Sequence, residues 1–296
     1  VDFLPLMVTA VRRHYSNGQI AGGYIKRETT RGTEDEVLLA RLIDRSIRPL
    51  FPEGFRDEVQ VYCYIMSVDP NVSPDVPAFL GVSAALAISD LPFDDIVSAV
   101  KIGYADQNYI GNPSDTQLET SDLNLFLAGK KSDNNDGIIM IEASANELGE
   151  KDALEAIPFG MEFMRSAFDN IQAFRDAYSN KHPEHAKRAK PEPKSYSDII
   201  ALIKEDAHKG YEIAYQVKPK QARSERIKQA HQDIIEKHSE KHDESDIKTA
   251  LDIIKKDWVR NFMFISQRRI DGRQFDEIRP IEAETGVLPR VHGDCV

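Results

Sequence analysis

The stretch TEDEVLLARLIDRSIRPLFPEGF, residues 33–55, decides how the first part of this chain folds. Thr33 is followed three residues later by Glu36, which is the spacing of a capping box at the start of a helix. Leucine and isoleucine then recur at helical spacing, which predicts a helix with one apolar side. Because Pro49 disfavours helical backbone at the residue before it, we expect the helix to end there.

Basic side chains follow another side of this predicted helix. Arg41, Arg45 and Arg48 are four and three residues apart, so they share a face. Asp44 can pair with Arg41 or Arg48. In one interpretation an arginine–aspartate network ties the helix to its sheet. In the other, the arginines form a basic patch that faces phosphate groups.

Two stretches resemble a known family. Residues 40–55, ARLIDRSIRPLFPEGF, closely resemble the signature of the first catalytic-core repeat of the polynucleotide phosphorylases. Residues 268–296 carry Arg-Ile-Asp-Gly-Arg, Ile-Arg-Pro and Leu-Pro-Arg-Val-His-Gly, and they resemble the start of an RNase PH-type core, which opens the second core in that family. The resemblance covers nearly the whole chain.

The bulk composition is that of an ordinary globular protein. The chain has 296 residues, of which 41% are hydrophobic and 29% charged, so it is long enough for two domains. A net charge of −11 argues weakly against nonspecific nucleic-acid binding by the whole surface, but it allows a local basic channel. Two isolated cysteines, Cys63 and Cys295, fit a reducing compartment. No apolar run approaches the ~18 residues of a membrane span.

An aromatic residue stands beside two cations in the tetrapeptide Tyr24, Ile25, Lys26 and Arg27. A ring can stack on a base while lysine and arginine contact phosphates, which suits single-stranded RNA. The alternative is an exposed turn with a half-buried tyrosine. Polynucleotide phosphorylases carry an aromatic-aromatic-basic-basic loop at this place that faces the central channel and grips RNA, so the resemblance implies RNA contact here. Ile25 replaces one of the two rings.

Other positions near this loop depart from the family pattern. Arg12 stands where the family usually has an acidic residue, Ala21 replaces a common proline, and residues 29–32 form a segment one residue longer than usual. We expect these changes to alter the grip on RNA more than the fold. Arg13 is counted with the candidate RNA contacts.

Period-two and helical patterns predict the remaining elements of the first part. Asp75 is expected to cap a helix of small residues that carries Pro77 in its first turn. The helix rich in Met and Phe is expected to start after Pro158 or to kink near it. The predicted elements are strands over 3–11 and 58–68, a hairpin of 97–104 and 108–110, strands over 123–128 and 138–143, and a long helix over 152–178.

The composition changes after the long helix. Residues 181–194 hold three prolines and many charges, which predicts a linker. Residues 197–264 are polar, poor in strand patterns and predicted to be helical. One helix face there carries Ile247, Leu251, Ile254, Trp258 and Phe262. Three histidines, His231, His238 and His242, lie among lysines and glutamates, so a solvated face is favoured over a metal site.

The final residues carry a turn and a short predicted strand. Asp271-Gly272 indicates the turn, and Val287-Leu288 lies in the strand between two glycines. Arg290 and His292 are basic and close together. A structural role and RNA contact are equally open for both.

The predicted fold class is α/β (α+β), an RNase PH-type core of mixed sheet with packed helices, followed by an all-helical domain. The expected division is a truncated first core at 1–180, a linker at 181–196, a helical connector at 197–264 and the beginning of a second core at 265–296. Because the chain starts and stops inside expected strands, we expect it to be a fragment of a longer protein.

The resemblance implies that the full-length protein is a polyribonucleotide nucleotidyltransferase, an enzyme of RNA processing and mRNA degradation. Such an enzyme degrades RNA from its 3′ end by phosphorolysis, releases nucleoside diphosphates and can run in reverse. Inorganic phosphate is the implied co-substrate and Mg²⁺ the implied cofactor, which oxygen ligands hold. The resemblance places the catalytic residues and metal ligands beyond Val296, and none is assigned within this chain.

The implied partners are single-stranded RNA, further copies in a homotrimer, and proteins of an RNA-degradation complex, with no membrane. The implied location is cytoplasmic, in a bacterium or alternatively an organelle. The alternative function is a noncatalytic module for RNA binding or oligomer assembly. A small-molecule α/β enzyme has no glycine-rich phosphate loop or metal-ligand spacing to support it.

Overall fold

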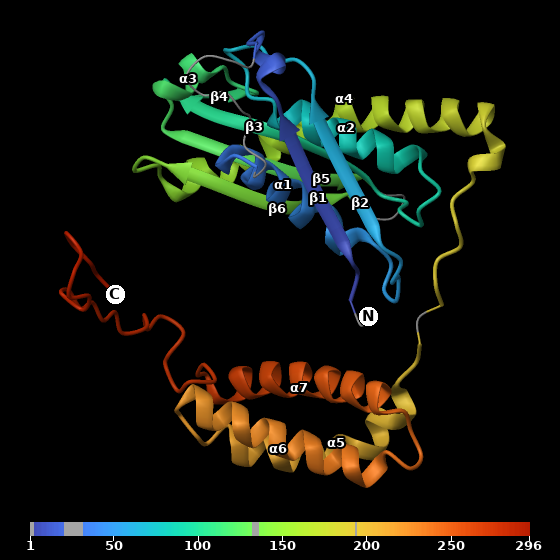
Figure 1. Ribbon diagram of the computed structural model, residues 1–296, viewed down its shortest axis with the longest axis vertical. Helices are drawn as coiled ribbons and strands as arrows, with labels where there is room; N and C mark the ends of the chain where they lie inside the picture. The colour runs from blue at the N-terminus through green and yellow to red at the C-terminus, as the bar shows by residue number, and fades with distance from the viewer. Residues whose placement is uncertain (1–2, 21–31, 132–135, 193) are drawn as a thin grey trace. The chain divides into compact units, whose positions relative to one another are not determined.

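The computed structural model describes residues 3–20, 32–131, 136–192 and 194–296, and the chain divides into two compact units, Val1–Pro193 and Lys194–Val296. The first unit combines strands and helices, and the helices of the second unit occur without named strands among the described residues (Figure 1). None of the described helices is long and apolar enough to cross a membrane.

The elements of the first unit fall into strands and helices. The strands are β1 (Leu6–Arg12), β2 (Val59–Ile65), β3 (Ile96–Ala105), β4 (Asn108–Gly111), β5 (Leu123–Lys131) and β6 (Gly137–Ala145). The α-helices are α1 (Glu34–Ile47), α2 (Asp75–Ile88), α3 (Asp115–Glu119) and α4 (Glu150–Lys181). Short 3-10 helices are η1 (His14–Asn17), η2 (Arg48–Leu50) and η3 (Pro183–His185).

The start and end of helix α1 agree with the sequence prediction. The Thr33 side chain accepts a hydrogen bond from the Glu36 amide, and the Glu36 carboxylate accepts one from the Thr33 amide, so the capping box is present. The α-helix ends at Ile47 and the chain continues through η2, which contains Pro49. Ile43 is fully buried, whereas Leu38, counted in the apolar stripe, remains 47% exposed.

Two sheets organise the first unit. Strands β1 and β2 pair in parallel, and α1 lies in the crossover between them. The other strands form an antiparallel sheet in the order β4-β3-β5-β6. The hairpin between β3 and β4 turns at Asp106 and Gln107, which both have positive φ, as a tight hairpin turn requires. The predicted strands of this region are therefore confirmed.

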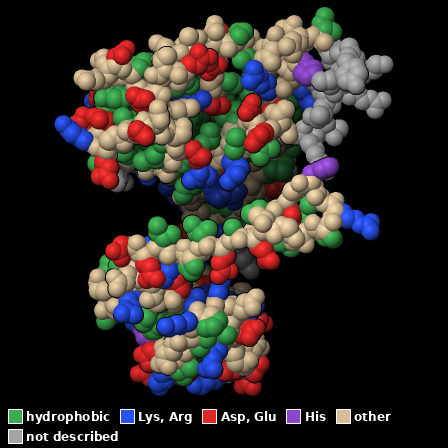
Figure 2. All heavy atoms as spheres, turned by 90° about the vertical axis from the view of Figure 1, so that its left-hand side faces the viewer, with side chains coloured by type: hydrophobic (Ala, Val, Ile, Leu, Met, Phe, Trp, Pro, Cys, Tyr) green, Lys and Arg blue, Asp and Glu red, His purple; other side chains and the backbone are tan. Residues whose placement is uncertain are grey.

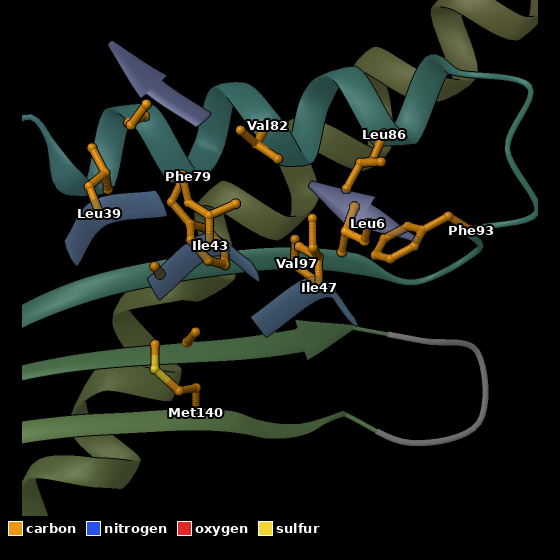
Figure 3. Packing of buried hydrophobic residues seen from close by; sticks show 14 of the residues in the cluster. Leu6, Leu39, Ile43, Ile47, Phe79, Val82, Leu86, Phe93, Val97 and Met140 are labelled. Carbon is orange, nitrogen blue, oxygen red and sulfur yellow. The ribbon is translucent and has the colours of Figure 1, made fainter. Parts of the chain in front are cut away.

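The two central strands of the antiparallel sheet, β3 and β5, are buried on both faces. Alternation along β3 sends Val97 and Ala99 into one core and Val100 and Ile102 into another. The first core joins that sheet to α1, α2 and the β1–β2 pair, and Figure 3 shows the apolar side chains of these elements converging. The second core lies between the opposite face and α4.

Helix α4 differs from the prediction at Pro158. The helix starts at Glu150 and continues through Pro158, so the proposed start after this proline is wrong. Pro158 is exposed, and Leu154, whose carbonyl loses an amide partner there, is 66% exposed. Solvent on that side can satisfy the carbonyl.

The cap of helix α2 is a second difference. The N-cap residue is Pro74 without a side-chain cap bond, and Asp75 is already helical. The Asp75 carboxylate instead pairs with the Lys101 ammonium at 2.8 Å. A negative charge in the first turn is still favourable because of the helix dipole. The prediction of a helix was correct, and its capping residue was wrong.

The second unit packs three described helices around one apolar core. They are α5 (Ser197–Ala214), α6 (Lys220–His238) and α7 (Glu244–Ser266). Of the predicted α7 stripe, Ile247, Leu251 and Ile254 are buried, whereas Trp258 and Phe262 are half-buried and stack with an interplanar angle of 9°. The helical prediction for this region is confirmed.

The predicted strand at Val287-Leu288 is not formed. A single bridge joins Thr285 to Cys295. The Asp294 carboxylate accepts hydrogen bonds from the amides of Gly286 and Leu288, at 3.1 and 2.6 Å. These side-chain bonds close a loop and use amides that a strand would offer to a neighbour.

Candidate functional site

A cavity of about 550 Å³ lies beside helix α1 in the first unit, and we call it the α1 groove. Its lining comes mainly from α1, β6 and the segment between β2 and α2, with one or two residues each from β1, β2, β3, β5, α2 and α3. Its charged lining residues are Arg12, Arg41, Arg45, Lys101, Asp35, Glu36, Asp69, Asp75, Asp115 and Glu142. On the face of the first unit that is visible in Figure 2, acidic and basic side chains are intermixed.

Arg48 and Asp44 follow the structural interpretation. The Arg48 guanidinium forms two bonds to the Asp44 carboxylate, at 2.9 and 2.6 Å, and donates to the carbonyls of Leu4 and Leu6. Its hydrogen bonds to Asp44 raise the pKa of Arg48, against an opposing effect of burial. The bidentate pair orients the guanidinium, and the two bonds to the Leu4 and Leu6 carbonyls fasten the end of α1 to the chain at the start of β1.

Arg45 and Lys101 are also paired within the groove. Arg45 bonds the Glu142 carboxylate of β6 at 2.7 Å, and both side chains are 54% exposed. Lys101 lies between Asp75 and the Ser73 hydroxyl, at 2.8 and 3.0 Å. Each of these cations is largely neutralised, so neither is a ready site for a phosphate group.

Arg41 differs from Arg45 and Lys101 because no acidic side chain among the described residues pairs with it. Its side chain is exposed and lines the cavity one helical turn before Arg45. Among the residues that the structure describes, Arg41 makes no ion pair or side-chain hydrogen bond. Its guanidinium therefore keeps all of its donors for an anion, as the phosphate-facing interpretation requires.

The Glu36 carboxylate joins two points of the chain that are distant in sequence. It accepts hydrogen bonds from the amide of Arg12 at the end of β1 and from the amide of Thr33 at the start of α1. Burial raises the pKa of Glu36, but these hydrogen bonds outweigh burial and the net pKa lies below its usual value. The Glu36 carboxylate beside the groove therefore holds Arg12 and Thr33, the two residues that flank the intervening segment, close to each other.

The predicted RNA contacts fall in different places. Tyr24, Ile25, Lys26 and Arg27 lie outside the described residues. Arg13 is exposed and its carbonyl accepts from the Ser16 amide and hydroxyl, at 3.0 and 2.7 Å. Arg12, the preceding residue, lines the groove, whereas Arg13 is not among the lining residues.

Two other predicted contacts belong to the second unit. Arg290 and His292 are both exposed, in the loop that the Thr285–Cys295 bridge closes. The Asp294 carboxylate holds that loop together by accepting hydrogen bonds from the amides of Gly286 and Leu288. Among the residues that the structure describes, neither side chain makes a hydrogen bond or ion pair that would explain a structural role.

The solvated face favoured for the three histidines of the helical unit is wrong for His231, which is half-buried. The ring of His231 bonds the hydroxyl of Tyr211 at 2.9 Å, and burial lowers the pKa of His231. Among the described residues, His231, His238 and His242 do not form a group that could hold one metal ion.

Sequence reasoning did not identify Lys101 or Glu142 as groove residues. Lys101 is the one charged residue in the strand sequence IVSAVKIGYA, and this was the available signal. Glu142 lies 97 positions from Arg45, and only the pairing of β5 with β6 brings it to α1. Arg12 was noted as a departure from the family pattern, without a place in a site.

Family models match most of the chain. The model for the 3′ exoribonuclease family, domain 1, matches residues 2–92, and domain 2 of that family matches residues 95–162. The model for the RNA-binding domain of polyribonucleotide nucleotidyltransferase matches residues 198–274. The fold of the first unit, with its mixed sheets and packed helices, is thus that of an RNase PH-type domain from the 3′ exoribonuclease family.

A curated relative matches the same order of domains along nearly the whole chain. It is a polyribonucleotide nucleotidyltransferase from Heliobacterium modesticaldum, which is 40% identical over 299 residues, covering 99% of this chain and 40% of the relative. The chain belongs to the polynucleotide phosphorylase family, and it spans about two fifths of the length of that relative.

A solved structure described as an archaeal exosome core is also similar. It is 20% identical, with a TM-score of 0.41, and the match covers 58% of this chain and 70% of that one. A likeness of this size supports no argument about function or assembly.

Proposed function

We propose that the full-length protein is a phosphate-dependent 3′-to-5′ exoribonuclease that releases nucleoside diphosphates, and that this chain positions RNA and supports assembly. The observation that carries the proposal is the order of three matched domains, together with a relative that is 40% identical over 99% of the chain. The reverse reaction, polymerisation from nucleoside diphosphates, uses the same groups by microscopic reversibility.

RNA contact in the first unit is proposed for two neighbouring sets of residues. One set is Tyr24, Ile25, Lys26 and Arg27 with Arg13, and the other is Arg41 in the α1 groove. Support comes from Glu36, which holds both ends of the segment that carries the tetrapeptide. A base stacked on Tyr24 and phosphates on the basic groups would hold a single strand without reading its sequence.

Arg290 and His292 are proposed as further RNA contacts in the second unit. Both side chains are exposed in a loop that Asp294 holds together. A loop fixed by its own carboxylate can present two cationic or hydrogen-bonding groups without rearranging, which lowers the entropic cost of binding.

Mg²⁺ and inorganic phosphate are proposed to bind in other parts of the full-length protein. Three of the six groove carboxylates already have partners: Glu36 is held by two amides, Asp75 by Lys101 and Glu142 by Arg45. Within the described ranges, none of them belongs to a group of three or more ligand atoms within reach of one ion. No chemical step through a metal ion is therefore assigned to this chain.

The remaining expectations are part of the same proposal. We divide the chain into a first core at 1–180, a linker at 181–196, a helical connector at 197–264 and the start of a second core at 265–296. The full-length protein is proposed to work as a homotrimer in the cytoplasm with proteins of RNA degradation. Exposed apolar side chains on β2, such as Tyr62 and Tyr64, provide surface for such contacts.

The test uses radiolabelled oligoadenylate with the full-length protein, with and without phosphate and Mg²⁺. The proposal expects nucleoside diphosphate to appear only when phosphate is present. Release of nucleoside monophosphate without phosphate would contradict phosphorolysis. Binding of the oligonucleotide with no product in any mixture would replace the enzyme by a noncatalytic RNA-binding or assembly module.

A further inference from the structure

A cluster of three metal-ligating side chains lies where helix α4 ends, away from the α1 groove. His182 follows the last residue of α4, and Glu184 and His185 belong to η3. Each side chain offers one ligand atom, and these atoms all lie within 4.8 Å of one another. In the parts of the chain that the structure describes, this is the one such group of three or more residues.

The local geometry already brings two of the ligands together. His182 Nδ1 and Glu184 Oε1 are 3.1 Å apart. Ligands bound at about 2.0–2.2 Å to one Zn²⁺ ion stand about 3 Å apart when they are neighbours in its coordination shell. An ion can therefore take the place of the proton between these two atoms with little movement of either side chain.

The third ligand is held near the other two by aromatic contacts. The rings of His182 and His185 stack with an interplanar angle of 13° and centroids 5.6 Å apart. Tyr178 packs against His182, and its hydroxyl bonds His185 Nδ1 at 2.7 Å. A hydrogen bond on Nδ1 fixes the ring and leaves Nε2 for an ion, which is the usual role of an outer partner at a metal site.

We propose that His182, Glu184 and His185 bind a divalent transition-metal ion, with Zn²⁺ as the ion that fits best. Two imidazoles and one carboxylate suit Zn²⁺, Ni²⁺ or Cu²⁺, whereas Mg²⁺ prefers oxygen ligands alone. Three protein ligands leave a position for water, and Glu184 and His185 are exposed, so the ion can enter from solvent.

The position of the site shows what the ion would do. Directly after η3, Lys187 donates to the Leu86 carbonyl at 2.6 Å, and the Arg188 amide donates to the Asp90 carbonyl at 2.7 Å. Arg188 also pairs with Asp57 and Asp90. The segment after α4 therefore runs along the first unit, and a metal ion at its start would lock the change of direction from the helix into this segment.

The test measures Zn²⁺ binding by equilibrium dialysis with ZnCl₂ on the full-length protein and three variants. Glu184→Gln keeps the shape of a ligand and removes its charge, and His185→Ala removes an exposed ligand. His242→Ala is the matched control, because His242 lies outside the cluster. We expect affinity for one equivalent of Zn²⁺ to fall at least tenfold in both cluster variants and to stay unchanged in the control.

A second measurement separates metal binding from a structural role of the histidine stack. Replacing Tyr178 by phenylalanine keeps the ring contact and removes the bond to His185, so we expect affinity for Zn²⁺ to fall about tenfold. The Co²⁺-loaded protein should show visible absorption that Glu184→Gln loses. Equal Zn²⁺ binding by the unaltered protein and Glu184→Gln, or the same loss in His242→Ala, would overturn the proposal.

Discussion

The two units differ in the sequence range of their internal contacts. In the first unit, Arg45 reaches Glu142 across 97 positions, and Lys187 reaches the Leu86 carbonyl across 101. In the helical unit many polar contacts are local, such as Gln229 with Asp233 four residues later. The first unit builds a groove from distant segments, whereas the second builds a core from periodic helix faces.

This difference explains where function can be located. A groove assembled from α1, β3 and β6 collects charges that no short sequence window contains. In the helical unit, one of the histidines, His231, is half-buried and bonds Tyr211. We therefore expect some substitutions in the first unit to change RNA binding and others to change the free energy of unfolding. Substitutions in the helical core are expected to change the free energy of unfolding alone.

The largest expected effect comes from emptying either core. Ile43 in the first unit and Ile203 in the second are both fully buried, so Ile43→Ala and Ile203→Ala should each cost about 2–5 kcal/mol of unfolding free energy. The single tryptophan, Trp258, lies in the helical unit and reports on it alone. Denaturant unfolding followed by Trp258 fluorescence should shift in Ile203→Ala and not in Ile43→Ala. An equal shift in both would show that the units unfold as one.

A smaller effect is expected at the pair that fastens helix α1. Arg48→Ala removes bonds to Asp44 and to the carbonyls of Leu4 and Leu6, and should cost about 1–3 kcal/mol. Arg48→Lys should lose most of the same stability, because lysine lacks the planar fork that reaches all three partners. Circular dichroism during urea unfolding measures both. Full stability in the lysine variant would show that charge alone is enough.

The stability of the helical unit should depend on pH through His231. Burial, with a smaller effect of Lys255, lowers the pKa of His231 in the folded unit below its ordinary value of 6.5. The unfolded chain then binds a proton more readily, so stability should be constant above that value and fall as pH decreases through it. Trp258 fluorescence during unfolding between pH 8 and about 5 measures this. His231→Gln should flatten the dependence, and an unchanged slope would contradict the assignment.

The smallest expected effect is at the exposed pair between α1 and β6. Because Arg45 and Glu142 are both 54% exposed, Arg45→Ala should change the free energy of unfolding by less than about 1 kcal/mol. A thermal unfolding scan checks this. A larger loss would mean that the pair stabilises the β6 edge in spite of its exposure.

The sequence predicted elements better than it predicted the site. The capping box at Thr33, the β3–β4 hairpin and the α7 stripe depend on local patterns, and each could be read in advance. The continuation of α4 through Pro158 could not, because it depends on which side of the helix meets solvent. The strand predicted at Val287-Leu288 does not form, because the Asp294 carboxylate accepts hydrogen bonds from the amides of Gly286 and Leu288.

Within the candidate site, the basic face of α1 was predicted and its partners were not. Arg48 proved structural and Arg41 stands open in the groove, although both arginines lie in the same helical pattern. The Arg45–Glu142 pair and the Lys101–Asp75 pair depend on where the sheet places β6 and β3, which one sequence does not display. The proximity of His182, Glu184 and His185 depends on how the chain turns after α4, which the sequence pattern alone does not show.

The central claim is that basic side chains of the first unit hold RNA. The most direct measurement is the salt dependence of oligoadenylate binding by the full-length protein, by Arg41→Ala, by the double variant Lys26→Ala/Arg27→Ala, and by Arg165→Ala as an exposed control outside the groove. Each lost phosphate contact should lower the slope of log Kd against log salt by about 0.7 for a single strand. We expect a loss of about 0.7 for Arg41→Ala, about 1.4 for the double variant and none for the control. Equal slopes in all four proteins would contradict the claim.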